Sequence, residues 1–84
     1  MPNFKASVVV SLRPSVLDPA GEATRSAAKK LGVEKITSLR IGKLIELELD
    51  ALNEEEARKQ VELLSDRLLA NPVIEDWSLK IETK

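Results

Sequence analysis

The chain has 84 residues, with 13 basic and 14 acidic side chains and a formal net charge of -1 at pH 7. This length predicts a single domain, residues 1–84, and the balanced charge offers no basic field that would gather nucleic acid or anionic lipid. Cysteine and histidine are both absent, which excludes disulfides and the usual soft metal ligands. A core of this size typically leaves only about 3–5 kcal/mol of net stability, so association with a partner is the expected remaining source of stability.

The first predicted element is a half-buried strand from Phe4 to Leu12. Apolar and polar residues alternate along it, and one face carries Phe4, Ala6, Val8, Val10 and Leu12. Val9 is the apolar exception on the other face. Pro14 ends the strand because its nitrogen cannot donate a hydrogen bond to a sheet.

A helix is predicted to begin at Asp18. Its carboxylate can accept hydrogen bonds from the first turn, and Pro19 at the first helical position has no N–H to leave unpaired. Small apolar residues follow at helical spacing and are expected to face a sheet: Ala20, Ala23, Ala27, Ala28 and Leu31. Capping accounts fully for Asp18 and Pro19. Gly21 is not needed by the helix, and its lack of a side chain would allow something else to approach the backbone closely there.

Two β-rich runs flank Gly42 and Lys43, which predicts a hairpin with a type II′ turn. The resulting cross-strand pairs are Ile41–Leu44, Arg40–Ile45, Ser38–Leu47 and Ile36–Leu49. Arg40 would then face the helix-covered side of the sheet, where it requires the sheet margin or an acidic partner. At the end of the hairpin, Arg40 and Lys43 are either solvated charges or polar contacts to a partner subunit.

A second helix is predicted to begin at Asn53, which has the capping-box spacing to Glu56. Its expected buried stripe is Ala57, Val61, Leu64 and Leu68. Asn71 and Pro72 stop the helix. A last strand then runs from Val73 to Ile81, with Val73, Trp77, Leu79 and Ile81 on one face and Ile74 on the other.

The order strand, helix, strand, strand, helix, strand predicts an α+β, ferredoxin-like split βαββαβ fold. Right-handed crossovers place both helices on one face of an antiparallel four-stranded sheet with strand order 4-1-3-2, giving a two-layer sandwich. The open face would carry an apolar set that suggests an interface: Val9, Leu39, Ile41, Leu44 and Ile74. The alternative is that scattered exposed apolar residues are normal on an open sheet.

No pattern in the chain predicts catalysis. There is no histidine or cysteine for acid–base or nucleophilic work at neutral pH, and no glycine-rich phosphate loop precedes a helix. The acidic run Glu54 to Glu56 is expected to be a charged helix start rather than a magnesium site. With one Phe and one Trp, the chain also lacks the aromatic platforms of an RNA-binding sheet. No apolar run is long enough for a membrane span, so a cytoplasmic protein is expected.

Several segments together resemble the PurS family, the small subunit of the three-part formylglycinamidine ribonucleotide (FGAM) synthetase of purine biosynthesis. The segments, in order, are Val16-Leu17-Asp18-Pro19-Ala20-Gly21, Leu31-Gly32, Arg40-Ile41-Gly42-Lys43, Glu46-Leu47-Glu48-Leu49 and Leu68-Leu69-Ala70-Asn71-Pro72-Val73-Ile74-Glu75-Asp76-Trp77. The last segment is the most specific of them. Trp77 departs conservatively from the Tyr or Phe more common in the family.

The resemblance implies a subunit with no active site of its own, in an ATP-dependent amide ligase complex (EC 6.3.5.3). It implies a homodimer or a dimer of dimers that bridges the glutaminase subunit (PurQ) and the ligase subunit (PurL) and aids ammonia transfer. No cofactor is expected here, since ATP and Mg would be used by the large subunit. The residues expected at interfaces are Val9, Asp18, Gly21, Leu39, Arg40, Ile41, Lys43, Leu44, Asn71 and Ile74.

Two other classes share the predicted order of elements. An ACT-like regulatory dimer would bind an amino acid near its first loop. An acylphosphatase would need a glycine-rich phosphate cradle after the first strand, and residues 13–16, Arg-Pro-Ser-Val, do not supply one.

Overall fold

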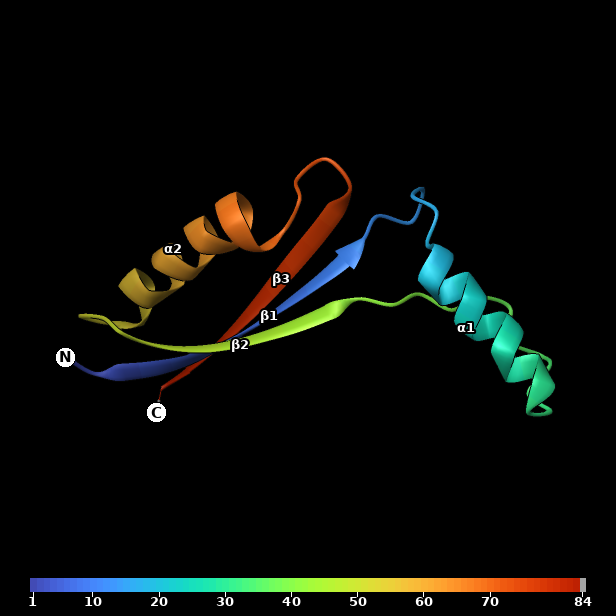
Figure 1. The fold of residues 1–84 in the computed structure, drawn as a ribbon. Coiled ribbons are helices and arrows are strands. Elements are labelled where there is room, and N and C mark those ends of the chain that lie inside the picture. The colour runs from blue at the N-terminus through green and yellow to red at the C-terminus, as the bar shows by residue number, and fades with distance from the viewer. Residues whose placement is uncertain (84) are drawn as a thin grey trace.

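The computed structural model describes residues 1–83 (Figure 1). Its elements in chain order are β1 (Asn3–Leu12), α1 (Pro19–Lys30), β2 (Lys43–Asp50), α2 (Glu54–Leu64), the π-helical turn η1 (Ser65–Leu69) and β3 (Glu75–Thr83). The strands form an antiparallel sheet in the order β2-β1-β3. The α+β class is confirmed, as are the central position of the first strand and its two predicted neighbours.

One face of the sheet forms the core beneath α2. The strand register sets Val8 between Ile45 and Leu79, and Ala6 between Leu47 and Ile81. The buried apolar residues are Phe4, Ala6, Val8, Val10, Ala51, Ala57, Val61, Ala70 and Ile81. The alternation names the correct inward face of the first strand and, from Trp77 on, of the last strand. The predicted start of the last strand is wrong, because β3 begins at Glu75 and Val73 is 75% exposed in the turn before it.

The last position of the predicted α2 stripe is wrong, and Leu64 before it is half-buried. Ala57 and Val61 are buried, but Leu68 is 73% exposed. The chain changes from α- to π-helical geometry at Ser65, and the wider turn rotates the residues that follow it. Ser65 takes the core position instead, fully buried and with no hydrogen-bond partner for its hydroxyl among the described residues.

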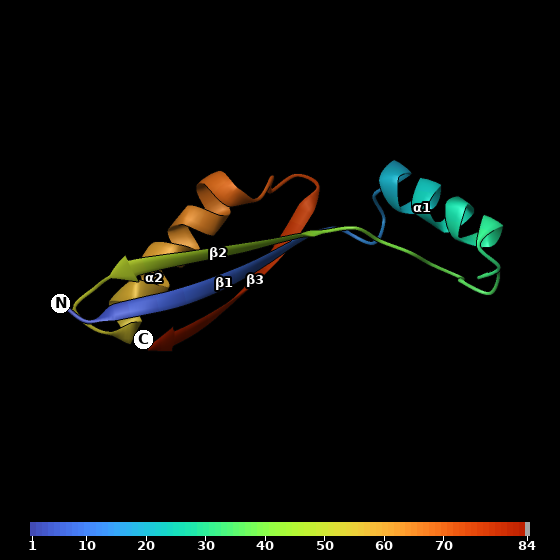
Figure 2. The same cartoon turned by 60° about the horizontal axis from the view of Figure 1, so that its bottom comes forward.

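The predicted hairpin is not formed, and the strand over 36–41 is absent. Residues 33–42 instead run back alongside α1, and together they make an arm (residues 19–42) that projects from the rest of the chain, the body (Figures 1 and 2). The molecule measures 52 × 27 × 14 Å with a radius of gyration of 16.6 Å, whereas a compact chain of this length has about 12 Å. Within residues 1–83 of the single chain the sheet therefore has three strands, and of the two long helices α2 alone covers it, which corrects the expected four-stranded sheet with two helices on one face.

Backbone contacts at Gly42 and Ile41 explain why the chain does not reverse there. A type II′ turn needs a positive φ at its first central residue, and Gly32 is the described glycine with a positive φ. Gly42 instead lies against the end of β1, where a Cβ would come within 2.7 Å of the Val10 carbonyl oxygen. The Ile41 N–H donates to the Asp18 carboxylate rather than to a neighbouring strand. β2 therefore continues straight into the arm.

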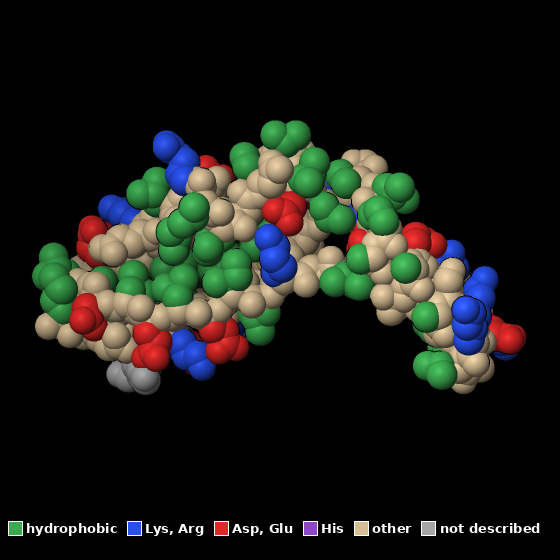
Figure 3. All heavy atoms as spheres, in the orientation of Figure 1, with side chains coloured by type: hydrophobic (Ala, Val, Ile, Leu, Met, Phe, Trp, Pro, Cys, Tyr) green, Lys and Arg blue, Asp and Glu red, His purple; other side chains and the backbone are tan. Residues whose placement is uncertain are grey.

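The α1 stripe and the sheet face that it was predicted to cover are both present, but they do not contact each other in the single chain. The α1 stripe that should face a sheet is exposed, with Leu31 85% exposed and Ala20, Ala23 and Ala27 also open to solvent. On the body, the β2 residues Ile45, Leu47 and Leu49 are half-buried beside the core. Hydrophobic side chains gather on this side of the body below α2 (Figure 3). The α1 stripe and the sheet face beside α2 are therefore both left uncovered, although each has the apolar character needed to cover the other.

Candidate functional site

Asp18 locks the two halves of the arm together. One of its carboxylate oxygens accepts from the Gly21 N–H at 3.0 Å and caps α1, as predicted. The other accepts from the Ile41 N–H at 2.8 Å, 23 residues along the chain. The side chain is 5% exposed. The returning segment is thus fastened to the first turn of the helix.

Gly21 makes this lock possible. A Cβ at this position would lie 2.3 Å from the Leu39 carbonyl oxygen and 2.8 Å from an Asp18 carboxylate oxygen. Real Cβ atoms do not approach a backbone oxygen so closely, so the segment lies against α1 only because residue 21 has no side chain. The close backbone approach predicted at Gly21 is confirmed, and the approaching backbone is that of Leu39. Arg25 adds a bond from its guanidinium to the Ile36 carbonyl oxygen at 3.3 Å.

The lock predicts a pH dependence. The N–H groups of Ile41 and then Gly21 lower the pKa of the Asp18 carboxyl, with a smaller contribution from the positive charge of Arg40. A lowered folded pKa stabilises the fold above the unfolded value of about 4 and ceases to do so as the pH falls through the folded value. We expect wild type to be more stable to urea than Asp18→Asn at pH 7, and we expect this difference to shrink at a pH well below the unfolded value of about 4. An unchanged difference at both pH values would contradict the role of the charge.

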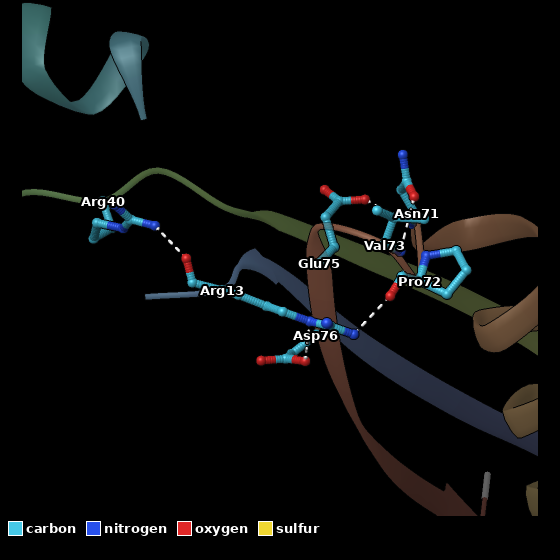
Figure 4. Close-up of polar contacts among 7 residues, drawn as sticks. All are labelled: Arg13, Arg40, Asn71, Pro72, Val73, Glu75 and Asp76. Atoms are coloured by element: carbon cyan, nitrogen blue, oxygen red, sulfur yellow. Dashed lines mark hydrogen bonds and ion pairs between the residues drawn. The ribbon is translucent and has the colours of Figure 1, made fainter. Parts of the chain in front are cut away.

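Arg13 and Arg40 join the body to the base of the arm (Figure 4). The Arg13 guanidinium donates to the Pro72 carbonyl oxygen at 2.6 Å and to the Asp76 carboxylate at 3.2 Å. The Arg40 guanidinium in turn donates to the Arg13 carbonyl oxygen at 2.8 Å. Arg40 was expected at the sheet margin or beside an acid; its bonded partner is a backbone carbonyl.

A second polar link lies at the same end of the sheet. Glu75 accepts from the Asn71 N–H at 2.7 Å, and its other oxygen lies 3.8 Å from the Lys43 ammonium. Asn71 also stabilises the turn that follows it, because its side-chain oxygen accepts from the Val73 N–H at 3.0 Å (Figure 4). Lys43 is therefore paired within the chain. This link fixes the loop after η1 against the first residue of β2.

The predicted apolar set divides between the open face and the arm. Val9 and Leu44 are direct cross-strand neighbours on the open face, 48% and 62% exposed. Ile74 is 37% exposed, next to the end of β1, and its carbonyl oxygen accepts from the Arg13 N–H. Leu39 and Ile41 lie on the arm, and Ile41 is 46% exposed.

The structure therefore brings the ten candidate residues into three groups around the place where arm and body meet. Asp18, Gly21, Leu39 and Ile41 form the lock; Arg40, Lys43 and Asn71 belong to the polar links; Val9, Leu44 and Ile74 are exposed apolar residues. Arg13 was missed. An arginine before a strand-ending proline gives no sequence signal that its guanidinium will bind a loop 59 residues away.

Within residues 1–83 no group of three or more acidic side chains is placed to hold a metal ion. The helices of the same residues are too short and too polar for any of them to cross a bilayer. The polar side chains at the base of the arm are occupied by structural hydrogen bonds, so this region is suited to positioning surfaces.

Comparison with known proteins decides the family. A family model named PurS and described as phosphoribosylformylglycinamidine (FGAM) synthase matches residues 5–83. The chain belongs to the PurS family. The PurS subunit of Synechocystis is 46% identical over 79 residues, which is 94% of this chain and 79% of that protein. The PurS subunit of Bacillus subtilis is 37% identical over 79 residues, 94% of this chain and 93% of that one.

Solved PurS structures share the arrangement of arm and body. A chain of the structure of PurLQS from Thermotoga maritima is 35% identical and superposes with a TM-score of 0.89 over 98% of this chain and 100% of that chain. B. subtilis PurS is 37% identical, with a TM-score of 0.82 over 94% and 98%. Coverage this complete includes the arm. The PurS assignment also displaces the ACT-like and acylphosphatase alternatives.

Proposed function

We propose that this chain is the non-catalytic PurS subunit of FGAM synthase in de novo purine biosynthesis. It bridges the PurQ glutaminase and the PurL ligase and aids ammonia transfer during the ATP- and glutamine-dependent conversion of the formylglycinamide ribonucleotide to the amidine. The observation that carries this proposal is the family match over residues 5–83, supported by the similarity to a chain of Thermotoga PurLQS. ATP and Mg are then bound by the ligase subunit, and the complex works in the cytoplasm.

The chemistry of the chain supports a bridging role. Its 84 residues include no histidine or cysteine, and Arg13, Asp18 and Glu75 are each held by structural hydrogen bonds. What the chain offers instead is uncovered surface on both arm and body. Such a subunit acts by placing partners relative to one another.

We further propose that the chain is a homodimer in which two copies exchange arms. Each arm leaves its own body and exposes a helix stripe fit for a sheet, while each body has a half-covered sheet face beside α2 and a free edge on β2. Laying one arm on the other body covers both surfaces at once. Each sheet then gains its fourth strand, completing the order 4-1-3-2 with strands from two chains.

The register predicted for a hairpin also fits two chains related by a two-fold axis near residues 42 and 43. Ile41 then lies opposite Leu44 of the partner subunit, and Val33 opposite Leu52 of the partner subunit. In the single chain these four side chains are 46%, 62%, 52% and 69% exposed, in that order. Cross-strand apolar pairs are what stabilise such an edge. Because one register pairs all four exposed side chains, it favours the exchange of arms between two chains. The open face of each sheet is left available for a dimer of dimers or for a larger subunit.

Reconstitution tests the bridging role. Purified PurQ and PurL should show glutamine-dependent amidation with this chain present and lose it when the chain is omitted, while amidation with added ammonia persists through PurL. The chain alone should hydrolyse neither glutamine nor ATP. Turnover by the isolated chain, or full glutamine-dependent activity without it, would overturn the proposal.

A further inference from the structure

Charge is segregated between arm and body. The arm carries five basic and two acidic side chains: Arg25, Lys29, Lys30, Lys35 and Arg40 against Glu22 and Glu34. Its tip is the most basic part, since Lys29 and Lys30 occupy the last turn of α1. On the body, the first turn of α2 holds three consecutive acids, Glu54, Glu55 and Glu56. Opposite charges therefore mark the ends of the two helices.

Within one chain these two charged ends lie far apart and have few partners of their own. Lys29 and Lys30 are exposed, and no hydrogen bond or ion pair joins them to another described side chain. Glu54 is likewise exposed. Glu55 and Glu56 share Lys59 at 3.8 and 3.9 Å, which are solvent-exposed pairs of little strength.

Arm exchange brings the two charged ends together. In Figure 1, α1 runs outward from the base of the arm, and α2 begins at the opposite end of the body, beside the chain termini. A two-fold axis near residues 42 and 43 therefore carries the tip of one arm to the start of α2 in the other body. The register agrees, because Val33 falls opposite Leu52 of the partner subunit, one residue before the Asn53 cap of α2.

We infer that Lys29 and Lys30 of one chain dock against the first turn of α2 of a second copy, and that this charge pairing directs arm exchange between chains. The two helices then lie antiparallel, so the negative end of one helix dipole meets the positive end of the other. The same pairing occurs twice in a symmetric dimer. In the strand register, Lys35 also falls opposite Asp50 of the partner subunit, which adds a further opposite-charge pair at each symmetric site. The inference rests on the dimer proposed above.

Two full-length variants provide a test with internal controls. Variant one is Lys29→Glu with Lys30→Glu, and variant two is Glu54→Lys with Glu55→Lys, which spares Asn53 and Glu56 of the cap. In either homodimer both docking points carry like charges, and we expect the dissociation constant to rise about tenfold or more. In a mixture of the two, both docking points again carry opposite charges. A heterodimer should therefore form in preference to either homodimer.

The readout is native mass spectrometry of a mixture in which one variant is ¹⁵N-labelled, with light scattering for affinity. Restored affinity in the mixture supports docking between chains. Variants that dimerise as tightly as wild type, or that are weakened but not rescued by mixing, overturn it while leaving the dimer intact. A monomeric wild type would instead remove the dimer itself. If either variant fails to fold, the milder Lys29→Gln with Lys30→Gln should still weaken the dimer and reduce its sensitivity to salt.

Discussion

Ile41→Glu is expected to convert the proposed dimer into a monomer of 9.3 kDa. Ile41 is 46% exposed in the single chain, and in the exchanged register it lies against Leu44 of the partner subunit, itself 62% exposed when alone. A carboxylate placed there replaces the apolar cross-strand contact with Leu44 of the partner subunit by a charge against an apolar side chain, at two symmetric sites. We expect the dimer dissociation constant to rise by about 100-fold or more, measured by analytical ultracentrifugation. Glutamine-dependent amidation in the reconstituted complex should fall with it.

Ser78→Glu is the matched control for Ile41→Glu. Ser78 is exposed on the open face of β3, where it neighbours Val9, and the substitution adds the same charge away from the arm. Arm exchange predicts that this variant stays dimeric. A dimer built by stacking two open faces would be broken by it. If Ile41→Glu stays dimeric and Ser78→Glu does not, the exchanged arrangement is wrong.

Local chemistry was enough to place most elements. Asp18 and Asn53 each cap the helix that they were predicted to begin, through bonds to the Gly21 and Glu56 N–H groups. Alternation along β1, and along β3 from Trp77 on, named the correct inward faces, because a side-chain period of two is fixed by the backbone itself. These features depend on neighbours within a few residues. Sequence alone is therefore sufficient for them.

The sequence could not show whether residues 36–41 pair with residues 44–49 of the same chain or of a second chain, because both arrangements have the same register. Ile41 opposite Leu44 satisfies the apolar pattern equally whether the two residues belong to one chain or to two. The choice depends on the path of the chain near Gly42. There the Val10 carbonyl oxygen and the Asp18 carboxylate hold the segment in line with β2. Contacts between residues more than 20 positions apart decide that path, and periodicity does not report them.

The base of the arm shows the same limit for side chains. The Arg13 guanidinium donates to the Pro72 carbonyl oxygen, and the Arg13 carbonyl oxygen accepts from Arg40. One residue therefore connects the loop after η1 to the base of the arm. The resemblance to PurS pointed to Asn71 and Arg40 but not to the arginine between them. Glu75, on the same face of β3 as Trp77, accepts its hydrogen bond from the Asn71 N–H, which no local sequence pattern indicates.

Gly21→Ala is expected to release the arm from its fixed shape. The added methyl group would lie 2.3 Å from the Leu39 carbonyl oxygen, so the returning segment must move away from α1 and the bond between Asp18 and the Ile41 N–H must lengthen or break. Although alanine is the better helix former, overpacking against backbone outweighs that gain, and we expect a loss of about 2 kcal/mol in unfolding free energy by urea denaturation.

A double-mutant cycle separates this mechanism from a general defect in α1. Ser26→Ala, at an exposed position of the same helix, should leave stability unchanged or slightly raised. If Gly21→Ala acts by breaking the lock, Asp18→Asn should cost much less stability in the Gly21→Ala background than in wild type, because the bond to Ile41 is already lost. The dimer should weaken in both single variants, since an arm without a fixed return segment no longer presents Ile41 to the partner. Additive losses would show that Gly21 and Asp18 act independently, and the arm would then not be a single locked unit.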